Sequence, residues 1–161
     1  MRILENFRFI IGKKVENDII KSRNYPKIRD FIQKNVEIFD CENCREREIL
    51  RPFVSANQLK KGEIDVILLG MKFYRENLKP VLILDDEWAR KFVEKNLKEL
   101  VVKTTSIFIR DCYMSYNIFG KNETLEIYNL MEKSKFRIRK EVVEKLKKEI
   151  EGCEKNEYKN S

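Results

Sequence analysis

The sequence predicts an α/β domain in which a small, mainly parallel sheet is flanked by helices. Helical and strand patterns alternate along the chain, as they do in proteins with parallel strands. Residues 81–84 form a continuous apolar run, VLIL, which is typical of a strand buried on both faces of a sheet. The chain has 161 residues and is 42% hydrophobic, which is enough for one domain with a hydrophobic core.

The first half of the chain predicts two short strands among helices. Residues 3–8 are expected to be the end of a helix. The elements predicted after it are a strand at 9–11, helices at 13–23 and 26–34, and a strand at 36–39. Residues 40–60 are highly charged and include Pro52, so we expect an irregular loop there.

The second half carries the stronger pattern. Residues 62–78 are apolar nearly all round a helix, which predicts a helix that is buried on most sides. The elements expected after it are a strand at 81–84, a helix at 87–96, a strand at 100–102, and helices at 105–117, 122–133 and 139–151. We expect one domain over residues 1–151 and a polar, flexible tail over 152–161.

Composition narrows the classes of function. The net charge of +7 favours a polyanionic partner such as RNA. The absence of histidine excludes Ser–His and Cys–His nucleophile pairs and HExxH zinc sites, so an enzyme with this sequence has to work with carboxylates and a metal. No apolar run approaches the roughly 20 residues of a membrane span, and the N-terminus lacks a signal-peptide core. We therefore expect a cytoplasmic protein with no membrane partner.

The cysteines offer an alternative metal site. Cys41 and Cys44 have the spacing of a zinc knuckle, but a structural zinc site needs four ligands. Cys112 and Cys153 stand alone in the sequence, and there is no histidine to complete a site. The pattern favours a polar loop with two incidental thiols over a zinc site.

Two adjacent carboxylates follow the apolar strand. Asp85 and Asp86 lie where open parallel sheets bind ligands, beyond the carboxyl end of a strand. A helix N-cap and a first-turn acid would also explain such a pair. On that reading Asp85 is the capping residue, and Asp86 is the one left for a site.

Asp18 and Asp65 each lie within an apolar helical stripe. Taken singly, each is explained as well by a partly buried carboxylate paired with Lys or Arg. Together with Asp86 at one sheet edge they would repel one another unless a cation lay between them, and oxygen ligands suit Mg²⁺ or Mn²⁺. These metals support phosphodiester hydrolysis. Glu63 is about 200° round the helix from Asp65, so we expect it to point away.

The chain resembles PIN-domain proteins over roughly residues 3–150. Residues 61–67, KGEIDVI, resemble the GExExI helix start of that family, and residues 81–90, VLILDDEWAR, resemble its strand-DDxxAR segment. Residues 136–142, FRIRKEV, are similar to the closing motif of an archaeal and bacterial PIN-like subgroup described as predicted nucleic-acid-binding. Residues 9–20 are similar to the segment in which the family carries its second acid, at Asp18.

The resemblance implies a three-layer sandwich and Mg²⁺- or Mn²⁺-dependent ribonuclease chemistry, often as the toxin of a toxin–antitoxin pair. It implies Asp18, Asp65 and Asp86 as the catalytic and metal-binding acids, with Asp85 beside them as an auxiliary ligand. A catalytically inactive module that binds RNA or a protein partner is the first alternative. A helical regulatory protein whose acids are structural is the second.

This sequence departs from the family at its start. Family members open with a central strand that ends in an aspartate, and in this sequence no aspartate precedes Asp18. Either the start codon is misplaced, or the site has degenerated. Candidate nucleic-acid-binding residues are Arg90, Thr104, Thr105, Lys133, Lys135, Arg137 and Arg139. The basic run at 133–148 fits a solvated helix face equally well. An antitoxin and a homodimer both stay open as partners.

Overall fold

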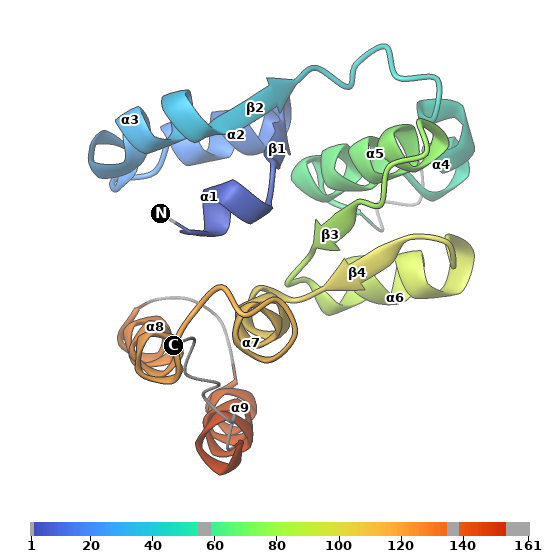
Figure 1. Cartoon of the computed structure of the whole chain (residues 1–161). Coiled ribbons are helices and arrows are strands. Elements are labelled where there is room, and N and C mark those ends of the chain that lie inside the picture. The colour runs from blue at the N-terminus through green and yellow to red at the C-terminus, as the bar shows by residue number, and fades with distance from the viewer. Residues whose placement is uncertain (1, 55–58, 135–138, 154–161) are drawn as a thin grey trace. The chain divides into compact units, whose positions relative to one another are not determined.

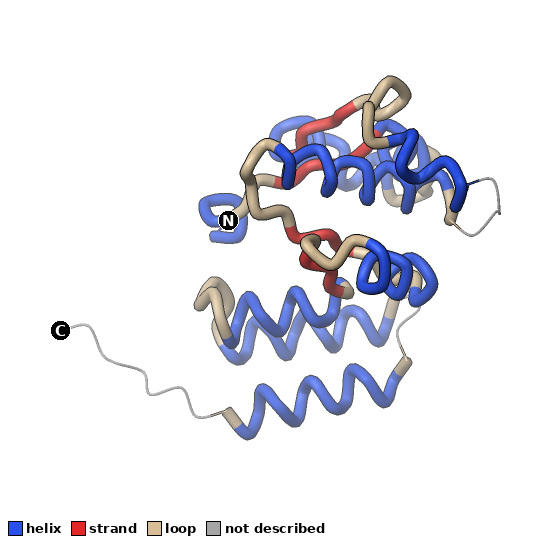
Figure 2. Tube along the Cα trace, turned by 90° about the vertical axis from the view of Figure 1, so that its right-hand side faces the viewer, coloured by secondary structure: helices blue, strands red, loops and turns tan. Residues whose placement is uncertain are grey.

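The computed structural model describes residues 2–54, 59–134 and 139–153 and confirms an α/β protein (Figures 1 and 2). The helices are α1 (Arg2–Asn6), α2 (Lys13–Ile20), α3 (Tyr25–Asn35), α4 (Arg47–Val54), α5 (Lys61–Arg75), α6 (Glu87–Asn96), α7 (Thr105–Met114), α8 (Lys121–Lys133) and α9 (Lys140–Gly152). The strands are β1 (Phe9–Gly12), β2 (Val36–Phe39), β3 (Val81–Ile83) and β4 (Val101–Lys103). The chain divides at residue 105 into two compact units, which are described separately below.

The strands of the first unit form two parallel pairs. β1 pairs with β2, with Phe9 opposite Val36, and β3 pairs with β4, with Leu82 opposite Val102. The expected parallel pairing is confirmed. The pattern predicts one sheet, however, and among the described residues β1 and β3 each have a single strand partner. Helix α5 contacts both β1 and β3, so it joins the two pairs in place of a shared ladder.

Helix α5 forms the centre of the first unit because apolar residues surround it. Ile67 and Leu68 have no exposed surface, which confirms the prediction of a helix buried on most sides. Gly70 lets β3 approach closely, since a Cβ there would lie 2.6 Å from Leu82 Cδ1. Phe73 packs edge-on against Phe39 of β2, with ring centroids 5.4 Å apart. The second half of the helix therefore packs against both strand pairs, through Leu82 of β3 and Phe39 of β2.

The prediction of an irregular loop over residues 40–60 is wrong in part, because helix α4 forms within this stretch. Leu50 is completely buried, and Phe53 packs against Phe92 of α6 at a centroid distance of 4.7 Å. Pro52 stands near the C-terminal end of α4, where only a short stretch of helix follows it. Burial of one apolar face thus holds a helix that charge and proline content disfavour.

The second unit is built from α7, α8 and α9 and has its own core. Its fully buried members include Tyr128 and Ile150, with Val143 and Leu146 nearly so. The Tyr128 hydroxyl donates to the backbone oxygen of Ser106 at 2.8 Å, and burial raises the pKa of this phenol. Helices α7, α8 and α9 lie close to the predicted ranges 105–117, 122–133 and 139–151.

The sequence also makes predictions about membrane spans, the domain boundary and the C-terminal tail. No helix in the described ranges has the length and apolar character that crossing a bilayer requires. One domain over 1–151 stays a prediction, as does a flexible tail over 152–161, most of which lies outside the described residues.

Candidate acidic site

Acidic and basic side chains meet at the carboxyl ends of β3 and β4. Asp85 and Asp86 follow β3, and Thr105 begins α7 just after β4. Lys60 and Glu63 belong to the start of α5, which is packed against β3. The site is therefore assembled within the first unit, from the ends of β3 and β4 up to Thr105 and from the first turns of α5 and α6.

Asp86 is the N-cap of α6. Its Oδ1 accepts the backbone N–H groups of Trp88 at 2.9 Å and Ala89 at 3.1 Å. Its Oδ2 accepts from the Lys60 ammonium at 2.7 Å. The hydrogen bond from Lys60 and those from the helix start lower the pKa of Asp86 below its ordinary value. The side chain is 31% exposed, so an ion in solution can reach it.

Asp85 binds the start of a different helix. Its two carboxylate oxygens accept from the Thr105 backbone N–H at 2.9 Å and from the Thr105 hydroxyl at 2.7 Å. The prediction that Asp85 caps α6 and frees Asp86 is therefore wrong, because the two roles are exchanged. The reason is the short connection after β4, which brings the start of α7 to the first carboxylate of the pair.

Glu63 lies beside Asp86, contrary to expectation. Its Oε2 accepts the Lys60 backbone N–H at 2.9 Å, and its Oε1 is 3.2 Å from Lys60 Nζ. The Lys60 ammonium thus lies between two carboxylates, which raise its pKa, the hydrogen bond to Asp86 most strongly. The sequence signal for this placement is a glutamate at the third position of a helix, where it reaches back to the N-cap.

Asp65 is buried and faces the start of α2. Only 2% of the residue is exposed, and its Oδ2 accepts the Lys14 backbone N–H at 2.9 Å. Gly12 makes room for it, since a Cβ on Gly12 would lie 2.4 Å from that same oxygen. Helix α2 has no cap from its own N-cap residue, which is Gly12. Asp65 therefore supplies a capping oxygen from a helix far away in the sequence.

Asp18 is exposed on α2 and lies near the first turn of α5. A Cβ on Gly62 would lie 3.8 Å from Asp18 Oδ2. Across the residues that the structure describes, no group of three or more Asp, Glu or Cys side chains is close enough to hold a metal ion. Asp86 and Glu63 share the Lys60 ammonium and Asp85 binds Thr105, whereas the Asp65 carboxylate binds the start of α2.

The candidate nucleic-acid-binding residues belong to both units of the chain. The Arg90 guanidinium donates to the backbone oxygens of Asp85 at 3.0 Å and Leu84 at 3.4 Å, so it holds the turn after β3. Thr104 lies between β4 and α7, Lys133 ends α8, and Arg139 is the N-cap of α9. Lys135 and Arg137 lie outside the described residues.

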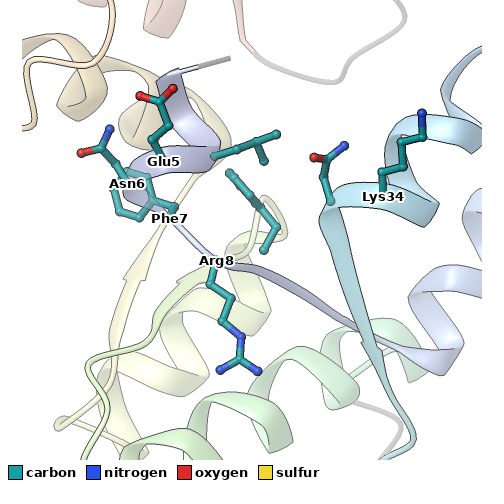
Figure 3. A pocket seen from close by; sticks show the side chains of 8 residues that line it. Glu5, Asn6, Phe7, Arg8 and Lys34 are labelled. Carbon is teal, nitrogen blue, oxygen red and sulfur yellow. The ribbon is translucent and has the colours of Figure 1, made fainter.

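A cavity of about 450 Å³ lies where β1 and β2 begin (Figure 3). It is lined by residues 4–9 and by Lys34 and Asn35. The Arg8 side chain is held by the carboxylate of Glu37. The cavity contains none of the acids predicted for a metal site.

Comparison of the chain with protein-family models, with curated proteins and with solved structures finds no match.

Proposed function

We propose that this protein is a PIN-like, Mg²⁺- or Mn²⁺-dependent ribonuclease whose metal site includes Asp86 and Glu63. The observation that carries the proposal is the position of Lys60 Nζ, 2.7 Å from Asp86 and 3.2 Å from Glu63. An ammonium held between two carboxylates marks a place that favours a cation. Lys60 is 77% exposed, so its side chain can leave without disturbing the core.

The donor set fits a hard divalent ion. Mg²⁺ is commonly bound by one or two carboxylates, with waters and substrate phosphates completing its shell. Asp86 and Glu63 would hold the ion, and Asp85 precedes Asp86 in the chain. A bound ion supplies Lewis-acid stabilisation of a phosphodiester and a water of lowered pKa.

The protein's own groups would orient the site and attract the substrate. Arg90 and Thr105 fix the backbone and side chain of Asp85, which keeps the strand end rigid. The chain's net charge of +7 favours association with a polyanion. Helix α5 joins two separate strand pairs, and among the described residues β1 and β3 each have one strand partner. This arrangement also supports the resemblance to a PIN-like sheet without its middle strand. RNA is the proposed substrate, and an antitoxin protein is a partner that the resemblance implies.

A catalytically inactive binding module is the second candidate. It is favoured by the pairing of the carboxylates, since Asp65 binds a backbone N–H and Asp85 binds Thr105. On this reading the acids are structural, and Lys60 stays in place as their counter-ion.

Titration with Mn²⁺ and an RNA-cleavage assay, both on the full chain, test the proposal. Trp88 is the only tryptophan, and its backbone N–H donates to Asp86, so its fluorescence is a probe close to the proposed metal site. We expect Asp86→Asn and Glu63→Gln each to weaken Mn²⁺ binding about tenfold or more and to abolish cleavage. Lys60→Ala removes a competing cation and is expected to strengthen Mn²⁺ binding.

The matched control is Glu123→Gln. Glu123 accepts the backbone N–H of Gly120 at the start of α8, so it has the same helix-start role as Glu63 but lies outside the candidate site. This variant is expected to bind Mn²⁺ and cleave RNA like the wild type. Equal metal binding by wild type, Asp86→Asn and Glu63→Gln would leave the inactive binding module as the better explanation.

A further inference from the structure

Cys41 and Cys44 lie in a tight turn directly after β2. The Cys44 backbone N–H donates to the Cys41 backbone oxygen at 3.3 Å, which closes a four-residue turn. Such a turn holds its first and last Cα atoms within about 7 Å. Disulfides span Cα separations of about 4.4–6.8 Å. The backbone therefore already holds these two cysteines at bridging range.

The thiols face one another and differ in access. Both are free, and they share a hydrogen bond. Cys41 is 1% exposed and belongs to the core of the first unit, whereas Cys44 is half-buried and packs against that core. Burial, more than the neighbouring thiol, raises the pKa of Cys41 to about 12. Cys44 is thus the thiol that a reagent in solution reaches first.

Several contacts hold the turn in this form. The Glu42 backbone N–H donates to Asp40 Oδ1 at 2.8 Å, and the Glu42 carboxylate accepts from Lys14 Nζ at 2.8 Å. Arg47 donates to the Cys41 backbone oxygen at 3.3 Å. A bridge between the thiols would therefore form on a turn that is already organised.

We propose that Cys41 and Cys44 are a reversible redox site, which closes to an intramolecular disulfide on reaction with a low-molecular-weight disulfide such as oxidised glutathione. The Cys44 thiolate attacks one sulfur of oxidised glutathione, forms a mixed disulfide and releases one glutathione thiolate. The Cys41 thiolate then attacks the Cys44 sulfur, closes the Cys41–Cys44 bond and releases the second glutathione. The protein loses two protons and two electrons, and two molecules of reduced glutathione are formed.

Thiol trapping on the full chain tests this site. The protein is equilibrated in glutathione buffers from fully reduced to fully oxidised, alkylated under denaturing conditions and digested with trypsin. Cleavage after Lys34 and Arg45 places both cysteines on the peptide 35–45, and Cys112 and Cys153 fall on two other peptides. In oxidising buffer we expect the 35–45 peptide to carry no alkyl group and to be two hydrogen atoms lighter than its free dithiol form. After treatment with dithiothreitol it should carry two alkyl groups again.

Cys44→Ser and Cys153→Ser form a matched pair of variants, because both cysteines are half-buried. The 35–45 peptide should close in Cys153→Ser as in the wild type, and no intramolecular bridge should form on it in Cys44→Ser. A doubly alkylated 35–45 peptide in fully oxidising buffer would overturn the proposal. So would accumulation of glutathione on Cys44 without closure.

Discussion

At the scale of single residues, the buried carboxylate of Asp65 offers the clearest test of a structural role. Its removal would leave the Lys14 backbone N–H without this acceptor in a part-buried setting. We expect Asp65→Ala to lower the free energy of unfolding by about 1–3 kcal/mol, the usual cost of an unsatisfied buried group. Chemical denaturation measures this change.

Asp18→Ala is the control for Asp65, since Asp18 is an exposed acid near the same first turn of α5. It should change the free energy of unfolding by no more than about 0.5 kcal/mol. If the two variants cost the same, the contact between Asp65 and the start of α2 contributes nothing to stability.

Asp86 makes stability depend on pH in a defined direction. Its pKa is lowered in the folded protein, first by Lys60 and then by the start of α6. The associated stability is therefore present above the unfolded pKa, near 3.8, and is lost as the pH falls through the folded value. Asp86→Asn keeps a capping oxygen but removes the charge, so it should cost about 0.5–1 kcal/mol at pH 7.

Denaturation of wild type and Asp86→Asn at a series of pH values checks this prediction. The difference between them should shrink below pH 4 and vanish in strong acid, where Asp86 itself is protonated. A difference that stays constant with pH would show that the ion pair with Lys60 is not the source of the effect.

At the scale of elements, the strand pairs predict an alternating pattern of protection from hydrogen exchange. The Leu84 backbone N–H donates to the backbone oxygen of Lys103 in β4. In the parallel ladder the Leu82 N–H also points towards β4. The intervening Ile83 N–H points to the side where no strand lies among the described residues. We expect the Ile83 amide to exchange faster than those of Leu82 and Leu84, by hydrogen exchange followed with NMR. Equal protection of all three would mean that the second edge of β3 is also paired.

Most elements of this fold could be predicted from the sequence, because apolar periodicity and the few Gly and Pro residues mark them. The VLIL run predicts β3 to within one residue, and the apolar stretch at 62–78 predicts the buried helix α5. Helix α4 could not be predicted, since its apolar face is buried by distant segments, among them α5 and Phe92 of α6. The division into two strand pairs depends on contacts between distant segments in the same way.

The site could be predicted only in outline. The carboxyl end of β3 and the pair Asp85–Asp86 follow from strand polarity. The 200° offset along α5 separates Glu63 from Asp65 as expected: Glu63 shares the Lys60 ammonium with Asp86, and Asp65 accepts the Lys14 backbone N–H at the start of α2. The orientation of the Asp65 side chain towards α2 depends on the glycine at position 12, which leaves room for the carboxylate. Such a close approach has no signature in the hydrophobic pattern.

At the scale of the whole molecule, the two units have separate hydrophobic cores. One core is formed by residues between Cys41 and Leu100, and the other by residues between Tyr113 and Ile150. Tyr128→Phe removes the buried hydroxyl that binds the Ser106 carbonyl, which should destabilise the second unit by about 1 kcal/mol. We expect faster hydrogen exchange in α8 and α9 and unchanged exchange in α5 and β3.

Uniformly faster exchange in both units would show instead that the chain opens as one cooperative body. Leu130→Ala is a suitable control, since Leu130 is 60% exposed on α8 and its truncation should leave exchange in both units nearly unchanged.

The close approach of Gly12 and Asp65 has an evolutionary consequence. Gly12 has an ordinary extended backbone, with φ of −81°, so its conformation is open to any residue and only the space taken by the carboxylate requires glycine. Positions 12 and 65 should therefore vary together in descendants of this sequence. A lineage that keeps an acid at 65 has to keep glycine at 12, and one that acquires a side chain at 12 has to lose the acid first. A mutational scan of all residue pairs at these two positions would reveal this order as sign epistasis.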